Sequence, residues 1–154
     1  MAEGPYWHAG RQSFFWVDID GKKFHEYKWK NGEVCEWKLD YRVSVITETK
    51  HNDQLLLGVQ GGLISFDLQS GTCTWLIDIE KEIPMNRTND GGCDPSGRLW
   101  IGTMHREFEK GKGSLYSVEH DLSLKKRWDN VTISNGIVWS QDGKRMYYID
   151  SPTR

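Results

Sequence analysis

The sequence lacks any apolar run long enough to cross a membrane, and it lacks a strong excess of either charge. Its 20 Lys and Arg residues against 22 Asp and Glu residues give a formal net charge of −2, and the basic residues are scattered. This pattern argues against nucleic acid and against an anionic membrane surface as partners. The first residues also lack the basic and apolar segments of a signal peptide, so we expect a cytoplasmic protein.

Cysteine is scarce, and the three that occur are too widely spaced to form a CxxC or Cys/His zinc motif. Cys35, Cys73 and Cys93 are therefore expected to be buried thiols in a reducing compartment. None of the five histidines stands four residues from another, which argues against a metal site built from histidine.

Glycine and aromatic residues are plentiful by contrast. The chain has 16 Gly, 8 Trp, 6 Tyr and 5 Phe, a combination typical of glycine-rich turns joining aromatic, β-branched strands. No convincing amphipathic helix is present, since the segment 79–84 is short and ends in proline. The composition predicts an all-β protein.

A repeat organises these strands. Four segments consist of a turn signal followed by a short apolar strand, and their equivalent residues Phe15, Leu56, Trp100 and Tyr147 are spaced by 41, 44 and 47 residues. A period in the forties with about four strands per unit is typical of a β-propeller blade.

The repeat predicts one partial β-propeller domain over residues 1–154, with three complete four-stranded blades and the start of a fourth. The predicted blades cover about 3–40, 41–79, 85–130 and 131–154. Such an arrangement leaves two open flanks with apolar surface. We therefore expect either a truncated form of a longer propeller or a half-propeller that completes itself by self-association through those flanks.

Polar residues recur in the first strand of the predicted blades. Glu3, Val45, Asn89 and Asn135 each stand about eight residues before a turn, and three of these four are acidic or amide residues. Equivalent positions of a radial repeat lie at the same height around the axis, so Glu3, Asn89 and Asn135 are predicted to converge at one mouth of the channel. Their oxygens suit a hard divalent cation. Ordinary turn chemistry is the alternative for each residue alone.

Five motifs, in order, resemble the gluconolactonase/regucalcin (senescence marker protein) family. They are Ala2-Glu3-Gly4-Pro5, Asn86-Arg87-Thr88-Asn89-Asp90-Gly91, Gly102-Thr103-Met104, Gly113-Ser114-Leu115-Tyr116 and Ser134-Asn135-Gly136. The resemblance implies a six-bladed propeller, roughly half of it present here, that hydrolyses sugar lactones with one divalent metal ion in its channel. Ca²⁺ or Zn²⁺ is implied, with Mn²⁺ and Mg²⁺ as alternatives.

Residue by residue, the resemblance implies that Glu3 and Asn135 are metal ligands and that Arg87 and Asn89 bind substrate. Arg87 stands two residues before Asn89 on the same strand face, where its fork of donors could hold substrate oxygens. Glu107 matches a substrate-binding glutamate more weakly because the loop varies, and a solvated loop charge is the simpler interpretation for it.

The family's third ligand, an aspartate in a Pro-Asp-Gly motif proposed as the general base, has no counterpart in this sequence. Asp142 and Asp150 do not match it, and the resemblance implies that it lies beyond Arg154, so no catalytic residue is assigned. We expect the isolated chain to bind metal weakly and to catalyse poorly. A serine esterase is disfavoured because no G-x-S-x-G motif occurs. A non-catalytic calcium-binding propeller and an interaction scaffold remain as alternative functions.

Overall fold

The computed structural model describes residues 2–152, and within that range every regular element is a β-strand. The strands form three four-stranded antiparallel sheets and one two-stranded sheet, as the repeat predicts. No helix that could span a membrane occurs in the described range.

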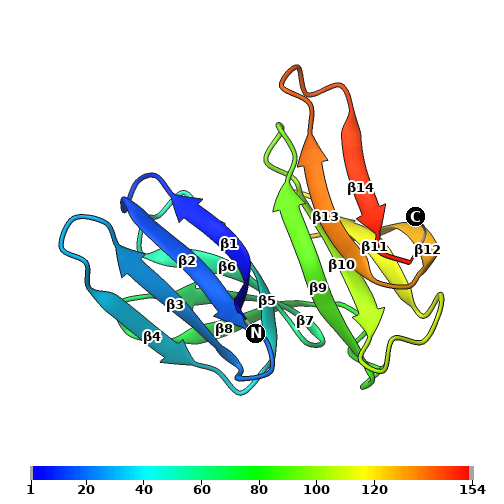
Figure 1. The fold of residues 1–154 in the computed structure, drawn as a ribbon, viewed down its shortest axis with the longest axis horizontal. Helices are drawn as coiled ribbons and strands as arrows, with labels where there is room; N and C mark the ends of the chain where they lie inside the picture. Colours follow the sequence, from blue (N-terminus) through cyan, green and yellow to red (C-terminus); the bar gives the residue numbers. More distant parts are fainter. Residues whose placement is uncertain (1, 153–154) are drawn as a thin grey trace.

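Each sheet is a meander in which successive strands pair with one another (Figure 1). Blade 1 consists of β1 (Ala2–His8), β2 (Ser13–Asp18), β3 (Lys23–Lys28) and β4 (Val34–Lys38). Blade 2 consists of β5 (Val43–Glu48), β6 (Gln54–Val59), β7 (Gly62–Asp67) and β8 (Cys73–Asp78). Blade 3 consists of β9 (Asn86–Cys93), β10 (Leu99–His105), β11 (Gly113–Val118) and β12 (Leu124–Val131), and the fourth sheet of β13 (Ser134–Trp139) and β14 (Met146–Asp150).

The first strands of consecutive sheets lie next to one another. Strand β1 contacts β5, β5 contacts β9, and β9 contacts β13, so the four inner strands line one side of the assembly. This is the arrangement of propeller blades around a channel. It brings residues that are about one repeat apart in the sequence into direct contact.

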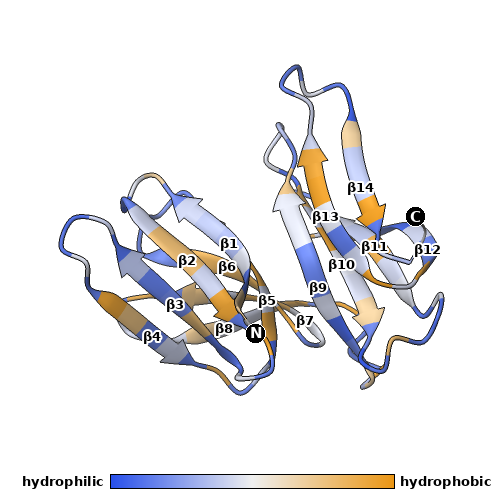
Figure 2. Ribbon diagram, in the orientation of Figure 1, coloured by the Kyte–Doolittle hydropathy of each residue, from blue (hydrophilic) through white to orange (hydrophobic). Residues whose placement is uncertain are grey.

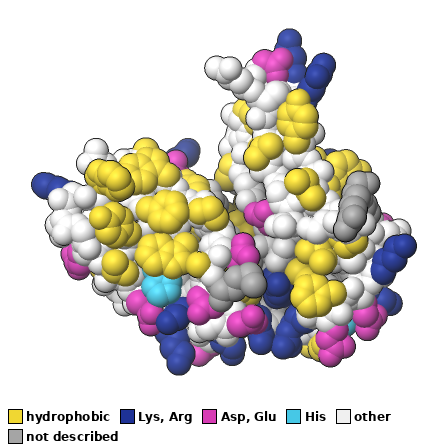
Figure 3. All heavy atoms as spheres, in the orientation of Figure 1, with side chains coloured by type: hydrophobic (Ala, Val, Ile, Leu, Met, Phe, Trp, Pro, Cys, Tyr) yellow, Lys and Arg dark blue, Asp and Glu magenta, His cyan; other side chains and the backbone are white. Residues whose placement is uncertain are grey.

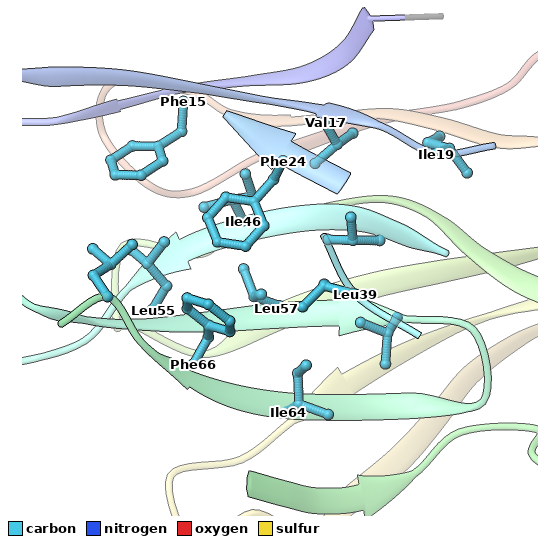
Figure 4. Close-up of a cluster of buried hydrophobic side chains, with 13 residues drawn as sticks. Phe15, Val17, Ile19, Phe24, Leu39, Ile46, Leu55, Leu57, Ile64 and Phe66 are labelled. Atoms are coloured by element: carbon cyan, nitrogen blue, oxygen red, sulfur yellow. The ribbon is translucent and has the colours of Figure 1, made fainter. Parts of the chain in front are cut away.

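The core is divided between the blade junctions. Alternate residues of β2 and β3 face blade 2, where Phe24 meets Phe66 edge to face with ring centroids 5.0 Å apart (Figure 4). A second cluster joins blades 2 and 3 and includes the fully buried Leu63 and Ile101. Each blade therefore depends on its neighbour to bury its apolar face.

The two outermost faces lack such a neighbour in the described range. On blade 1, Phe14 stacks on Trp16 and remains 37 % exposed. Hydrophobic side chains, drawn in yellow, gather on the left of the view in Figure 3, where blade 1 lies. On the fourth sheet, Val138, Tyr147 and Ile149 are each more than half exposed. Figure 2 shows the corresponding hydrophobic stretches on β2, β13 and β14. The expected open flanks are therefore present.

The expectation of buried cysteines is wrong. Cys35 is only partly buried, and Cys73 and Cys93 are exposed, all three as free thiols. The reason is their position: Cys35 and Cys73 belong to β4 and β8, the last strands of their blades, and Cys93 ends β9.

Candidate functional site

A pocket of ≈ 350 Å³ lies where the N-terminal parts of β1, β9 and β13 meet. Four of the five predicted site residues line it, and they come from three different sheets: Glu3, Arg87, Asn89 and Asn135. The structure therefore brings together side chains that are up to 132 residues apart in the sequence. Their roles as ligands and substrate contacts stay predictions.

A β-bulge marks this position in every inner strand. The pairing of each first strand with the second shifts register between Glu3 and Tyr6, between Val43 and Val45, opposite Gly102 and Thr103, and between Ser134 and Ile137. Bulges re-aim side chains and are common beside active sites. Here they take Asn89 and Asn135 out of the regular alternation and turn them to the pocket.

The strand pairing also corrects one prediction from the sequence, the equivalence of Val45 with Asn89. Val43 pairs with Val59 as Thr88 pairs with Thr103, so the blade 2 counterpart of Asn89 is Ser44 and not Val45. All four equivalent positions, Glu3, Ser44, Asn89 and Asn135, are therefore polar. Ser44 is buried and faces blade 3 instead of the pocket.

Arg87 is partly buried, and its guanidinium is held by its own strand. Its Nη1 donates to the carbonyl oxygen of Thr88 at 3.0 Å and to Oδ1 of Asn89 at 2.6 Å. Burial lowers the pKa of Arg87, while the charges of Asp20 and Glu3 raise it and those of Arg42 and Arg106 lower it further. Arginine nevertheless remains a cation at neutral pH. Its remaining N–H groups can bind oxygens of a ligand.

Asn89 links blade 3 to the fourth sheet. Its Oδ1 accepts from Arg87, and its Nδ2 donates to the carbonyl oxygen of Ser134 at 2.7 Å. The Asn135 side chain is exposed, and its Nδ2 donates to Oγ of Ser151 at 3.3 Å. Asn135 thus presents Oδ1, a good oxygen ligand, without a partner among residues 2–152.

Several pocket residues were not identified from the sequence. Asp20 lies in the β2–β3 turn and pairs with Nε of Arg42 at 3.3 Å. Phe108, Met104 and Ile133 supply an apolar wall. Asp20 follows a strand and precedes a glycine, the pattern of an ordinary turn, so no local signal distinguishes it.

Glu107 does not line this pocket. It is exposed in the loop after β10, where its carboxylate clusters with His105 and Glu109, whose ligand atoms lie within 4.8 Å of one another. The backbone N–H of Glu107 points to Nδ1 of His105 at 3.3 Å. In a neutral ring that bond leaves the proton on Nε2, which then cannot ligate a metal ion. We therefore do not place a metal in this cluster.

The general base has no assigned position among the described residues. It is expected beyond Arg154, and Arg154 itself lies outside the described residues, so this expectation stays a prediction. The last two aspartates of the sequence, Asp142 and Asp150, stabilise local structure instead. Asp142 accepts from the hydroxyl of Ser140 at 2.6 Å in the β13–β14 turn, and Asp150 accepts the backbone N–H groups of residues 132 and 133. Neither aspartate lines the pocket.

A second pocket of ≈ 490 Å³ lies between the blades near Tyr41, Trp75 and Lys81. None of the predicted site residues lines it. The Trp75 ring is already covered by Lys81, whose Nζ stands 4.4 Å from the ring centroid. The smaller pocket, with its converging oxygens and its arginine, is therefore the candidate functional site.

Comparison with known proteins extends the sequence resemblance. The family described as the SMP-30/Gluconolactonase/LRE-like region matches residues 1–154. Regucalcin of Gallus gallus is 35% identical over 157 residues, covering 98% of this chain and 52% of its own length. L-arabinolactonase of Azospirillum brasilense is 32% identical over 157 residues, covering 100% of this chain and 52% of its own length.

Solved structures of other proteins are also similar to this chain. A crystal structure of a calcium-binding protein, regucalcin, from Agrobacterium tumefaciens superposes with a TM-score of 0.94 at 32% identity, covering 99% of this chain and 51% of that one. A gluconolactonase from Xanthomonas campestris, at 19% identity and a TM-score of 0.81, shows the same fold. The chain spans about half the length of the relatives it matches.

Proposed function

Because the chain belongs to the SMP-30/gluconolactonase/LRE-like family, we propose that it supplies the metal-binding and substrate-binding wall of a site that hydrolyses sugar lactones. One observation carries the proposal: Glu3, Arg87, Asn89 and Asn135 converge on a single pocket from three sheets. Relatives named as a sugar lactonase or an arabinolactonase support the substrate class.

The donor set fits a hard divalent cation. Glu3 offers a carboxylate and Asn135 an amide oxygen, and neither oxygen group is engaged in a hydrogen bond or ion pair with another described residue. Ca²⁺, Mn²⁺ and Mg²⁺ prefer such oxygen ligands, and Zn²⁺ accepts carboxylates. A bound cation would polarise the lactone carbonyl as a Lewis acid. Two protein ligands are fewer than these ions require, which is why we expect weak binding by this chain alone.

The neighbouring residues would orient the sugar. Arg87 and Asn89 hold each other in place and keep N–H groups free for hydroxyl oxygens of the substrate. The apolar side chains of Met104, Phe108 and Ile133 line the other part of the pocket, where they would pack on carbon atoms of the ring and exclude water. Such fixed positioning favours attack on the carbonyl carbon.

The pocket offers no obvious general base among the described residues. Asp90 uses both carboxylate oxygens to accept backbone N–H groups, and Asp20 is paired with Arg42. Glu3 is reserved for the metal ion in this proposal. We therefore expect slow turnover by residues 1–154, with the proton-accepting group supplied from elsewhere in a complete propeller.

The test is calorimetric titration of the chain with Ca²⁺, Mn²⁺ and Zn²⁺, combined with pH-stat measurement on five- and six-membered sugar lactones. Glu3→Gln should weaken metal binding by at least about 10-fold. Glu82→Gln removes another exposed carboxylate, in the loop before β9, and should leave the affinity unchanged. Equal binding by wild type and Glu3→Gln, or no binding to wild type at millimolar metal, would refute the proposed site.

A second candidate function is calcium binding without catalysis, since the Agrobacterium relative is described as a calcium-binding protein. Arg87 distinguishes the two. In a lactonase, Arg87→Lys should weaken binding of a lactone or its hydroxy-acid product while metal affinity stays the same. In a protein that only binds calcium, lactones should produce no heat of binding with either variant.

A further inference from the structure

Two consecutive side chains of β9 bind the two peptide groups on either side of Asn135. Nδ2 of Asn89 donates to the carbonyl oxygen of Ser134 at 2.7 Å, and the backbone N–H of Gly136 donates to Oδ2 of Asp90 at 2.6 Å. The Ser134 carbonyl belongs to the peptide before Asn135, and the Gly136 N–H belongs to the peptide after it. The two bonds therefore act on both backbone torsions of Asn135.

The strand ladder does not fix these peptides by itself. The pairing of β13 with β14 goes from Ser134 opposite Asp150 directly to Ile137 opposite Tyr148, which leaves Asn135 and Gly136 in the bulge. Gly136 also has a φ of +82°, in the left-handed region that favours glycine. A segment outside the ladder with this conformation needs support from another element, and β9 provides it.

Asp90 is fully engaged in this support. Its Oδ1 accepts the N–H of Gly91 at 2.7 Å while Oδ2 accepts that of Gly136, so each carboxylate oxygen receives one backbone donor. A carboxylate that binds N–H groups is a stronger acceptor than a neutral amide. Asp90 lines the pocket, but its oxygens point to backbone donors instead of standing free.

We propose that Asp90 is a positioning residue, which holds the backbone of Asn135 so that the amide oxygen faces the pocket. The inference rests on the proposed function, because it takes Asn135 to be a metal ligand. Residues that orient metal ligands through hydrogen bonds commonly change metal affinity by 10- to 100-fold when they are removed.

The test compares Asp90→Ala with Asp20→Ala in the full 154-residue chain. Both variants remove one carboxylate from the same pocket, but only Asp90 touches the Asn135 segment. Two quantities are measured: hydrogen exchange of the Gly136 amide by NMR without metal, and calorimetric affinity for Ca²⁺ and Mn²⁺.

Asp90→Ala should speed exchange of the Gly136 amide and lower metal affinity by about 10- to 100-fold. Asp20→Ala removes the same charge from the pocket without touching residues 134–136, so it should leave exchange of the Gly136 amide unchanged and lower metal affinity less than Asp90→Ala does. Asp90→Asn keeps one acceptor oxygen for the Gly136 N–H, so it should change amide exchange and metal affinity less than Asp90→Ala does. This conservative variant also serves if Asp90→Ala does not fold. Equal losses of metal affinity in Asp90→Ala and Asp20→Ala would mean that the removed negative charge alone explains the effect. That result would overturn the proposal.

The exchange measurement separates this inference from the proposed function. If wild type binds no metal but Gly136 loses protection in Asp90→Ala, the metal site is wrong and Asp90 still holds the Asn135 backbone. If Gly136 exchanges equally fast in wild type and Asp90→Ala, the role given to Asp90 is wrong whatever the metal affinity.

Discussion

The hydroxyl groups of Ser44 and Thr88 lie 2.7 Å apart in the buried junction between blades 2 and 3. Both side chains are at most 2 % exposed, and they stand on neighbouring inner strands, β5 and β9. The bond joins the strand beside the pocket to the blade before it. The two residues are 44 positions apart in the sequence, and Thr88 directly precedes Asn89.

Breaking this pair should destabilise the chain. Ser44→Ala leaves the Thr88 hydroxyl buried without its partner, at a cost of about 1–3 kcal/mol in the free energy of unfolding. The double variant with Thr88→Val removes both hydroxyls and should recover much of that loss. Urea unfolding of the wild type, the two single variants and the double variant measures these differences in the free energy of unfolding. Ser96→Ala, in an exposed turn, is the control. Strict additivity of the two substitutions would contradict a direct bond.

Gly102 should resist substitution because Ser134 of the fourth sheet packs against it. A Cβ at Gly102 would collide with Oγ and Cβ of Ser134, whereas a Cβ at Gly92 would meet its nearest neighbour, the Trp139 ring, at 3.6 Å. We expect Gly102→Ala to cost about 1–3 kcal/mol. Gly92→Ala, on the paired strand, should change stability by less than about 0.5 kcal/mol. Equal melting temperatures for the two variants would show that the blade 3–4 contact is looser than described.

Asp94 should make stability depend on pH. Burial by itself raises the pKa of Asp94, but hydrogen bonds from Nε1 of Trp100 and from the backbone N–H groups of Arg98 and Ser96 outweigh it, so the pKa falls below the ordinary 3.8. A lowered pKa in the folded state gives stability that is full above about pH 5 and is lost as the pH falls through 3.8 toward the folded value.

The comparison of wild type with Asp94→Asn tests this. At pH 7 the variant should be less stable, and the difference in free energy of unfolding should shrink as the pH falls from about 5 through 3.8 and below. Glu82→Gln, an exposed carboxylate in another loop, controls for the change in net charge. A difference that stays constant while the pH falls from about 5 to well below 3.8 would show that the substitution acts through shape and not through ionisation.

The open flanks should cause self-association. Phe14 on blade 1 and Tyr147 on β14 are 37 % and 54 % exposed, on faces that a neighbouring blade would cover. Sedimentation velocity should show a mass that rises with concentration, and Phe14→Glu or Tyr147→Glu should lower it. Leu122→Glu, in an exposed turn away from both faces, should have no effect. A wild-type chain that stays monomeric up to millimolar concentration would contradict the prediction.

The sequence by itself determined the strands and their grouping into blades. Turn residues and alternating apolar residues are local signals, so hairpins such as β3–β4 and β7–β8 follow from short stretches of chain. The same repeat placed Glu3, Asn89 and Asn135 at one height, because equivalent positions of a radial repeat share a level. The structure has all three at one pocket.

Only the tertiary structure decided the details at the pocket. The loop between the first two strands is one residue longer in blade 2, where Glu48 pairs with Leu55, than in blade 3, where Cys93 pairs with Leu99. Only the pairing therefore shows that Ser44 and not Val45 is the counterpart of Asn89. The bond from Gly136 to Asp90 joins residues 46 positions apart, and Asp20 reaches the pocket from another blade. Such contacts depend on how whole sheets pack, and no local pattern encodes that packing.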